Sequence, residues 1–151
     1  MAKVLISPGK YVQGAGEMKK LGEYAQNYGK KALILISKGG YKRIGAMVEK
    51  SFEGKECGYV FDYFNGECSK KEIKRLGEIV KKEACDVVIG IGGGKIFDTA
   101  KAVAYYEKTP VLICPTIAST DAPCSALSVI YTEEGVFEEY LFLPSNPRSE
   151  E

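Results

Sequence analysis

The sequence predicts an α/β fold, in which a parallel sheet carries helices on both faces and is followed by a β-hairpin. Short β-branched or apolar runs alternate with amphipathic helical stretches as far as Pro115, which is the pattern of strands joined by crossover helices. Beyond Pro115 a polar loop leads into two apolar runs joined by Thr132–Gly135, a spacing typical of a hairpin. With 151 residues, 45% of them hydrophobic, the chain is long enough for one domain with a substantial core.

The first half of the chain contains three predicted strands and two predicted helices. A strand at Val4–Ser7 ends at Pro8 and Gly9. An apolar stripe over Glu17–Tyr28 predicts a helix that stops at Gly29. The elements expected next are a buried strand, a helix, a third strand and its exit loop, at Ala32–Ser37, Tyr41–Phe52, Cys57–Phe61 and Asp62–Gly66.

The second half continues the alternation and then departs from it. Ser69 and Glu72 have the spacing of a capping box, which predicts the start of a helix that ends near Glu83. The most strand-like run, Val87–Ile91, passes directly into three glycines and a further helix. The remaining expected elements are a fifth strand at Val111–Cys114 and the hairpin strands at Ala126–Tyr131 and Val136–Phe142, whereas Arg148–Glu151 is expected to form no element.

Composition excludes several classes of function. Lys and Arg number 21 against 20 Asp and Glu, and a formal charge of +1 gives no broad attraction to nucleic acid or to an anionic membrane. Histidine is absent, which rules out His-dependent acid–base catalysis, Ser-His-Asp triads and imidazole-bound metals within these 151 residues. Five cysteines without a Cys-x-x-Cys pair argue against a disulfide framework or a thiolate metal site.

The same features predict the compartment. The apolar stretch near the N-terminus is too short for a signal peptide, and no run approaches the ~18 apolar residues of a membrane span. Together with the cysteine usage, this leads us to expect a soluble cytoplasmic protein with neither a membrane nor a nucleic-acid partner.

The strongest local signal is the unit formed by the strand Val87–Ile91, the turn Gly92–Lys95 and the following helix. Glycines let the backbone approach an anion, and a helix N-terminus presents unpaired N–H groups, which together suit a phosphate or pyrophosphate. The unit is neither the dinucleotide fingerprint, since the sixth position from Gly92 is Phe97, nor a P-loop. A tight turn that only joins strand to helix remains the alternative. Asp98 is expected in the first helical turn, where helix-end stabilisation alone would explain it.

A second candidate segment, Pro115–Pro123, follows the carboxyl end of a predicted strand, where open α/β sheets usually bind ligands. Its hydroxyl and carboxylate side chains could orient a small polar ligand; they are Thr116, Ser119, Thr120 and Asp121. A solvated loop of turn-forming residues is an equal alternative. Cys114 and Cys124 flank the segment and are interpreted as small apolar fillers.

Three segments, Ile6–Gly14, Ile91–Val103 and Pro115–Tyr131, together resemble the iron-containing alcohol dehydrogenase family and, within it, the enzymes that oxidise glycerol. The resemblance runs from Lys3 to Pro147. It implies a Rossmann-like N-terminal nucleotide-binding domain over 1–147 and a non-family tail over 148–151, with the family's C-terminal helical domain absent. The implied reaction is NAD-dependent oxidation of glycerol or a similar small polyol, with zinc or another divalent metal assisting hydride transfer.

The resemblance also implies roles for individual residues. The pyrophosphate would lie beside Gly92, Gly93, Gly94 and Lys95, with Asp98 closing that turn. The adenine side of the cofactor would contact Thr116 and Ser119. The nicotinamide half would be lined by Ser125, Leu127 and Tyr131, and the glycerol hydroxyls would lie beside Asp121.

Two departures from the family limit these expectations. NAD-using members commonly place an Asp at the end of the second strand, to bind the adenine ribose, whereas this chain has Ser37 followed by Lys38. The hypothesis is relaxed discrimination between NAD and NADP, or weaker NAD binding. The family's metal ligands, one Asp and two His, belong to its C-terminal domain, so the resemblance predicts a truncated chain without a complete catalytic site or metal ligands, inactive on its own.

Two other functions are weighed against this one. A non-catalytic, nucleotide-binding or oligomerising protein could modulate a full-length paralogue and self-associate through the apolar face that would dock the second domain. A hydrolase acting through Ser119 or Ser125 is disfavoured, because neither serine lies in a Gly-x-Ser-x-Gly elbow and no His can act as its base.

Overall fold

The computed structural model describes residues 9–116 and 123–144, and the backbone of 148–150. The strand predicted at Val4–Ser7 and the site residues Ser119 and Asp121 lie outside these ranges. None of the helices in the described ranges combines the length and the apolar character needed to cross a membrane.

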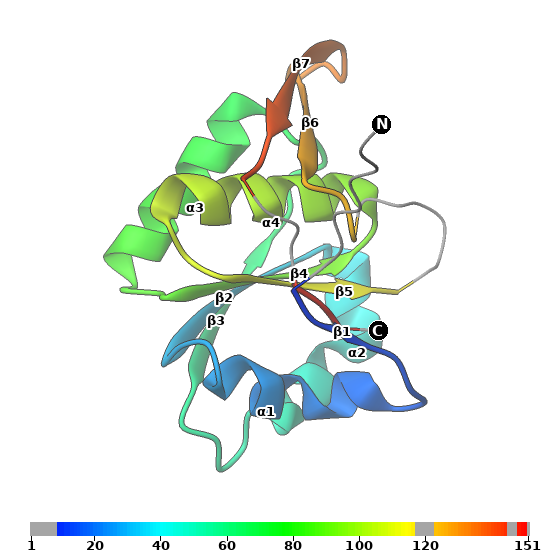
Figure 1. Ribbon diagram of the computed structural model, residues 1–151, viewed down its shortest axis with the longest axis vertical. Coiled ribbons are helices and arrows are strands. Elements are labelled where there is room, and N and C mark those ends of the chain that lie inside the picture. The colour runs from blue at the N-terminus through cyan, green and yellow to red at the C-terminus, as the bar shows by residue number, and fades with distance from the viewer. Residues whose placement is uncertain (1–8, 117–122, 145–147, 151) are drawn as a thin grey trace, which may run out of the picture.

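A parallel sheet forms the centre of the molecule (Figure 1). Its strands are β1 (Tyr11–Val12), β2 (Lys31–Ile36), β3 (Gly58–Tyr63), β4 (Val87–Gly92), β5 (Val111–Pro115) and β8 (Arg148–Glu150). They lie in the order β1-β8-β5-β4-β2-β3, and every pairing between them is parallel. Because Ile36 of β2 pairs with Ile91 of β4, the carboxyl ends of these two central strands are level.

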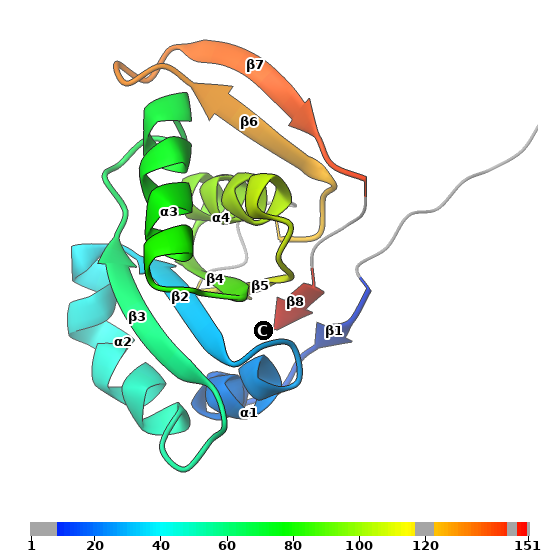
Figure 2. The same ribbon diagram turned by 90° about the vertical axis from the view of Figure 1, so that its left-hand side faces the viewer.

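Helices cover both faces of the sheet, as the sequence predicts (Figures 1 and 2). The 3₁₀ turn η1 (Glu17–Lys20), α1 (Leu21–Gln26) and α2 (Lys38–Ser51) lie on one face. The other face carries α3 (Lys70–Lys82) and α4 (Gly94–Glu107), with the antiparallel hairpin β6 (Leu127–Tyr131) and β7 (Phe137–Phe142) beyond them. The predicted α/β class and the separate hairpin are therefore confirmed.

Two hydrophobic cores follow from the period-2 alternation of the buried strands. Leu33 and Leu35 of β2 pack on the α3 and α4 side, together with Phe97 of α4. Ile34 and Ile36 point to the opposite face and pack with the buried residues of α1 and α2. Each central strand is thus apolar on both sides, which is why its sequence is a continuous apolar run rather than an alternating one.

Local capping explains where α2 and α3 begin. Ser69 accepts a hydrogen bond from the Glu72 N–H at 3.2 Å, the predicted N-cap of α3. The Glu72 carboxylate pairs with Arg75, so the described contacts form one half of the predicted capping box. Ser37 caps α2 in the same way, through the Gly40 N–H at 3.0 Å. This cap starts α2 at Lys38, three residues before the predicted start.

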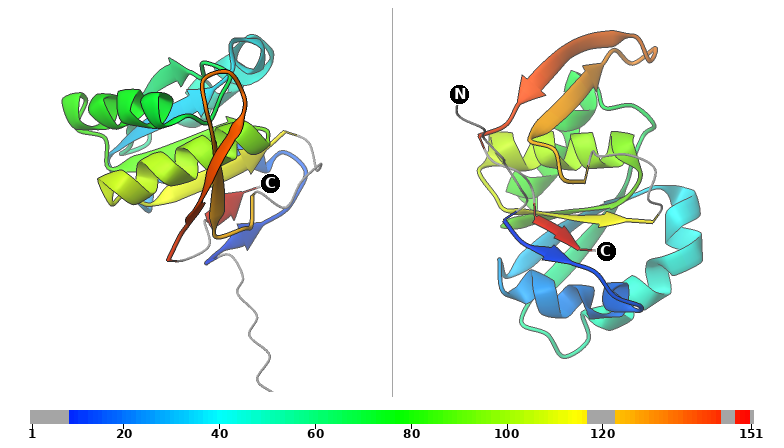
Figure 3. Two further views of the ribbon diagram at one scale, coloured as in Figure 1. Left: turned by 90° about the horizontal axis from the view of Figure 1, so that it is seen from above. Right: turned by 45° about the vertical axis from the view of Figure 1, so that its right-hand side comes forward.

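Two further predictions differ from the structure. The segment predicted as one helix over Glu17–Tyr28 is a 3₁₀ turn followed by a short helix that ends at Gln26. The expectation that Arg148–Glu151 forms no element is wrong, because Arg148–Glu150 forms β8 between β1 and β5 (Figure 3). Its register with Leu112 and Ile113 of β5 is a long-range pairing, which no local pattern encodes.

Candidate functional site

The candidate site lies at the carboxyl ends of β2 and β4, the two central strands. After β2 the chain enters α2 on one face of the sheet, and after β4 it enters α4 on the other face (Figure 1). Neighbouring strands whose connections leave in opposite directions form a topological switch point, where open α/β sheets bind their ligands. Ser37 and Gly93, which directly follow these strands, are therefore placed at one edge of the sheet.

The glycine-rich turn presents backbone rather than side chains. Gly92 has a φ of 145°, which favours glycine because other residues rarely adopt it. Gly93 occupies the N-cap position of α4, and a Cβ atom built on it would meet no atom of the described residues within 4 Å. Among the described residues, no side chain caps this helix, and its first turn contains no acidic residue. None of the described side chains therefore fills the space in front of these amide groups, which carry the positive end of the helix dipole.

Gly90, inside β4, is a glycine whose role sequence reasoning missed. A Cβ atom at this position would lie 2.8 Å from the Ala100 Cβ atom of α4, which is closer than real side chains approach. Because Gly90 has no side chain, α4 packs closely on β4. This close packing determines the position of the N-terminus of α4. A glycine in the middle of a buried strand was the available signal.

Thr116, predicted to contact the adenine side, is anchored to the glycine-rich turn. Its hydroxyl donates to the Gly92 carbonyl oxygen at 3.2 Å, and its N–H donates to the same oxygen at 3.1 Å. These two hydrogen bonds hold the exit of β5 against the exit of β4 at the edge of the sheet.

Lys95 and Tyr131, both predicted site residues, are brought together. The Lys95 ammonium lies 5.7 Å from the centre of the Tyr131 ring and 2.7 Å from Glu67 Oε1. Glu67 was not predicted, because it lies in a loop without a recognisable motif. Its second carboxylate oxygen is buried without a hydrogen-bond partner among the described residues. The ion pair is partly exposed, which limits its contribution to about 1 kcal/mol.

Asp98 occupies a different position from the one expected. Because α4 begins at Gly94, Asp98 lies beyond the first helical turn, so the expected first-turn interaction with the helix dipole is wrong. The side chain is largely buried and faces the hairpin. Its Oδ1 atom lies 3.1 Å from the Lys101 ammonium, and its Oδ2 accepts from the Val129 N–H at 3.3 Å.

Lys101, which sequence reasoning missed, binds the segment that contains Ser125 and Leu127. The lysine is 1% exposed, yet its ammonium donates to the carbonyl oxygen and hydroxyl of Ser125 and to the carbonyl oxygen of Leu127. Two residues predicted to line the nicotinamide half are thus tied to α4. A lysine on the apolar face of a predicted helix was the signal that could have identified it.

Ser37 is half-buried at the end of β2, and its hydroxyl is engaged as the α2 cap. The following residue, Lys38, places its ammonium 5.9 Å from the centre of the Tyr63 ring. This end of the strand therefore presents a hydroxyl and a nearby cation in place of a carboxylate.

The donor atoms of the described residues do not fit a metal centre. The sequence has no histidine, and the described ranges contain no cluster of three metal-ligating side chains. Burial raises the pKa of the Cys57 thiol to about 11 and that of the Cys68 thiol to about 12. Both thiols are protonated at neutral pH, and so they are poor nucleophiles.

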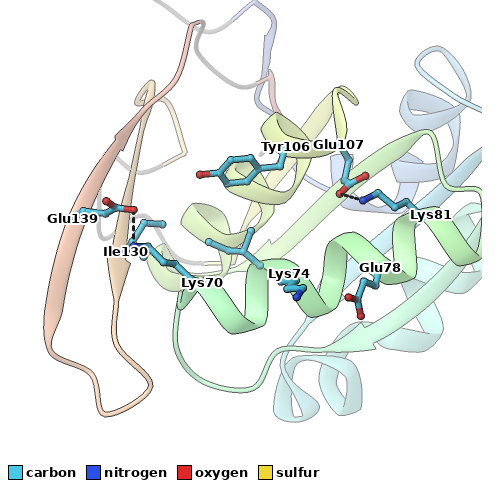
Figure 4. A pocket seen from close by; sticks show the side chains of 9 residues that line it. Lys70, Lys74, Glu78, Lys81, Tyr106, Glu107, Ile130 and Glu139 are labelled. Carbon is cyan, nitrogen blue, oxygen red and sulfur yellow. Dashed lines mark ion pairs between the residues drawn. The ribbon is translucent and has the colours of Figure 1, made fainter.

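A cavity of about 370 Å³ lies between α3, the end of α4 and the hairpin (Figure 4). Its apolar lining includes Ile73, Ile130 and the aromatic ring of Tyr106. The charged lining is balanced, with three lysines and three glutamates; Lys81, for example, pairs with Glu107 at 3.5 Å. None of the glycine-rich turn residues lines this cavity, and its balanced charge gives no preference for a dianionic ligand.

Comparison with known proteins identifies relatives over nearly the whole chain. The model of the iron-containing alcohol dehydrogenase family matches residues 8–148. A glycerol dehydrogenase of Escherichia coli is 51% identical over 149 residues, and one of Thermotoga maritima is 53% identical over 154 residues. Each alignment covers 97% of this chain and 40% of the relative, so the chain spans about 40% of the length of the curated relatives it matches.

A solved structure agrees with these matches. The crystal structure of a probable glycerol dehydrogenase from Sinorhizobium meliloti superposes with a TM-score of 0.89 at 42% sequence identity. The superposition covers 99% of this chain and 40% of the other.

Proposed function

Because the chain belongs to the iron-containing alcohol dehydrogenase family, we propose that it binds nicotinamide adenine dinucleotide at the carboxyl edge of its sheet, with the pyrophosphate against the N-terminus of α4. The observation that carries this proposal is the start of α4 at Gly93, which no side chain of the described residues caps or fills. A pyrophosphate there would accept hydrogen bonds from the first amides of the helix and interact favourably with its dipole. The glycine-rich turn leaves the space that such an anion needs.

Each predicted contact has a proposed role in this arrangement. Gly92, Gly93, Gly94 and Lys95 border the pyrophosphate. Thr116, held against Gly92, and Ser119 contact the adenine side. Ser125, Leu127 and Tyr131 line the nicotinamide half. Asp98 is proposed to support the site indirectly, because the described contacts of its carboxylate are with Lys101 and Val129 rather than with the glycine-rich turn.

The proposed reaction is the one that the relatives' names state, the dehydrogenation of glycerol. Bound NAD supplies the hydride acceptor. This chain's residues hold and orient the cofactor, and Asp121 is proposed to lie beside the substrate hydroxyls. The donor set does not fit a metal, and so no step assigned to these residues involves one. We expect that the 151-residue chain alone does not oxidise glycerol.

Ser37 carries the proposed cofactor preference. NAD specificity in such folds depends on a carboxylate that binds the ribose hydroxyls and repels a 2′-phosphate. With a capping hydroxyl and Lys38 at this position, the repulsion is absent. We therefore propose that NADP is accepted alongside NAD.

An oligomerising role is the second candidate, with a second copy of this chain as the partner. Its support is a cluster of exposed aromatic side chains on β7, namely Phe137, Tyr140 and Phe142, exposed by 50%, 56% and 74%. Clusters of exposed apolar groups mark interaction surfaces. Light scattering over a range of concentrations tests it: a mass that rises toward that of a dimer supports association, and a constant monomer mass refutes it.

Calorimetric titration of the chain with NADH, ADP-ribose and nicotinamide mononucleotide tests the proposed binding site. NADH and ADP-ribose, which contain the pyrophosphate, are expected to bind with a Kd of roughly 1 mM or below. Nicotinamide mononucleotide, which lacks the pyrophosphate, is expected to bind far more weakly. Absence of binding by both pyrophosphate ligands would overturn the proposal.

A further inference from the structure

Lys101 is a buried cation that joins two segments distant in the sequence. Its ammonium lies 3.1 Å from Asp98 Oδ1 on its own helix. Across the interface it donates to the Ser125 hydroxyl at 3.2 Å, to the Ser125 carbonyl oxygen at 3.3 Å and to the Leu127 carbonyl oxygen. The lysine is 1% exposed, so these interactions replace its hydration.

The hydrogen bonds and the ion pair of Lys101 depend on direction and distance more strictly than apolar packing does. An apolar side chain at this position would tolerate small shifts of its neighbours. A buried ammonium requires its acceptors at hydrogen-bond distance, since a buried charge without partners is strongly unfavourable. The buried ammonium therefore determines the positions of Ser125 and Leu127. Apolar packing alone would only keep them in contact with α4.

Other contacts connect β6 to α4 without the Lys101 ammonium. The Ser128 hydroxyl donates to the Asp98 carbonyl oxygen at 2.8 Å, and Ser128 is fully buried. These contacts attach β6 to the helix. Lys101 acts at the start of β6, through Ser125 and Leu127.

The helix relates Lys101 to the glycine-rich turn. Lys101 and Gly94 lie on one continuous α-helix, about 10 Å apart along its axis at 1.5 Å per residue. A rigid helix thus carries the candidate pyrophosphate site at its start and, two turns later, the anchor for Ser125 and Leu127.

We propose that Lys101 is a positioning residue that sets the distance between the pyrophosphate site and the segment 125–127, and thereby the binding of the nicotinamide half of the dinucleotide. This inference rests on the proposed function. Lys101 itself has no contact with the cofactor in this proposal. Its effect passes through Ser125 and Leu127, so it should change the affinity for ligands that contain nicotinamide and leave the affinity for ADP-ribose unchanged.

The test compares NADH with ADP-ribose in the double variant Asp98→Asn/Lys101→Met. Both side chains keep their approximate shape, and neither charge is left without its partner, which is the tolerated way to remove a buried ion pair. The single variant Lys101→Met is measured beside it. Ser128→Ala is the matched control, since it weakens the attachment of β6 to α4 but keeps the ammonium and its acceptors.

The expected result is an increase of about tenfold in the Kd for NADH in the double variant, with the Kd for ADP-ribose unchanged. Ser128→Ala should lower the melting temperature without changing the ratio of the two Kd values. Equal changes for both ligands, or none for either, would overturn the inference. So would a double variant that does not fold, because Lys101 would then be a core residue of the domain.

Wild-type titrations separate this inference from the proposed function. If the wild-type chain binds neither NADH nor ADP-ribose, the proposed function fails. If it binds both and the double variant keeps the wild-type ratio, only the role of Lys101 fails. Hydrogen exchange of the wild-type chain gives a further measurement: NADH should protect the amides of Ser125–Val129 more than ADP-ribose does, and equal protection would contradict the inference.

Discussion

Gly90 of β4 lies so close to Ala100 of α4 that a Cβ atom on the glycine would come within 2.8 Å of the alanine Cβ. Both residues are in the buried region between the sheet and the helix. The contact determines how closely α4 approaches β4, and therefore where Gly93 and the first amides of α4 lie relative to the edge of the sheet.

The first prediction concerns this contact. Gly90→Ala should lower the free energy of unfolding by about 1–3 kcal/mol, because the added methyl group forces the helix and strand apart. Denaturant unfolding measures the change. In the background of Ala100→Gly, which removes the opposing methyl group, the same substitution should cost less. An equal cost in both backgrounds would show that the Gly90–Ala100 contact is not the cause.

The second prediction concerns the cofactor preference at Ser37. Ser37→Asp keeps an N-cap residue of the preferred type and introduces a carboxylate at the end of β2. The melting temperature should stay close to that of the wild type, and the Kd for NADPH should rise by about tenfold relative to that for NADH. Fluorescence titration with both reduced cofactors measures this ratio. Ser37→Asn, which caps without a charge, is the control and should leave the ratio unchanged.

A wild-type chain that already prefers NADH strongly would contradict the relaxed preference proposed for Ser37. In that case an Asp at the end of β2 would not be needed for discrimination between NADH and NADPH.

The third prediction is a pH dependence that arises at the opposite edge of the sheet. Asp86 Oδ1 accepts from the N–H groups of Lys30 and Lys31, at 2.8 and 2.9 Å. Desolvation opposes ionisation of this carboxyl group, but the N–H donors outweigh it and lower its pKa below the usual 3.8. The ionised form therefore stabilises the folded chain above the unfolded-state pKa, and that contribution is lost as the pH falls through the folded-state pKa.

Asp86→Ala should accordingly lower the free energy of unfolding by about 1 kcal/mol at pH 7, a modest value because the group is solvent-accessible. The difference between wild type and variant should persist down to about pH 5 and shrink below about pH 4. Urea unfolding at several pH values measures it. A difference that stays constant down to pH 2 would show that the ionised carboxylate is not responsible.

Local sequence patterns predicted the parts of the fold that local physics determines. The Ser69 cap, the apolar strands and the glycine-rich turn were found because propensity and periodicity are properties of neighbouring residues. The pattern predicts too late a start for α2, because Gly39 and Gly40 usually weaken a helix and hide the capping role of Ser37. The strand β8 was missed because its stability comes from β5, about 36 residues earlier in the chain.

The candidate site also contains residues that local sequence predicts and contacts that it does not. Gly92 and Gly93 were identified from the strand–turn–helix order alone. The partners that hold the site together, Glu67 with Lys95 and Lys101 with Ser125, join residues more than twenty positions apart. Such pairs depend on how the hairpin and the loops pack on α4. No spacing rule in a single sequence contains that information.

Charge placed at Gly93 tests whether a dinucleotide pyrophosphate binds the start of α4. Gly93 has the backbone conformation of an N-cap, with φ −126° and ψ −171°, so Gly93→Asp should fold and keep or slightly raise the melting temperature. The carboxylate introduced by this substitution would accept hydrogen bonds from the first N–H groups of α4 and repel the phosphates of the dinucleotide. Gly93→Asn caps the helix without a charge and is the control.

The deciding measurement is the Kd for NADH of the two Gly93 variants and the wild type. Gly93→Asp should weaken NADH binding by at least about tenfold more than Gly93→Asn does, and this difference between the two Kd values should shrink as salt is added. If a folded Gly93→Asp variant binds NADH as tightly as the wild type, the pyrophosphate does not bind at the start of α4.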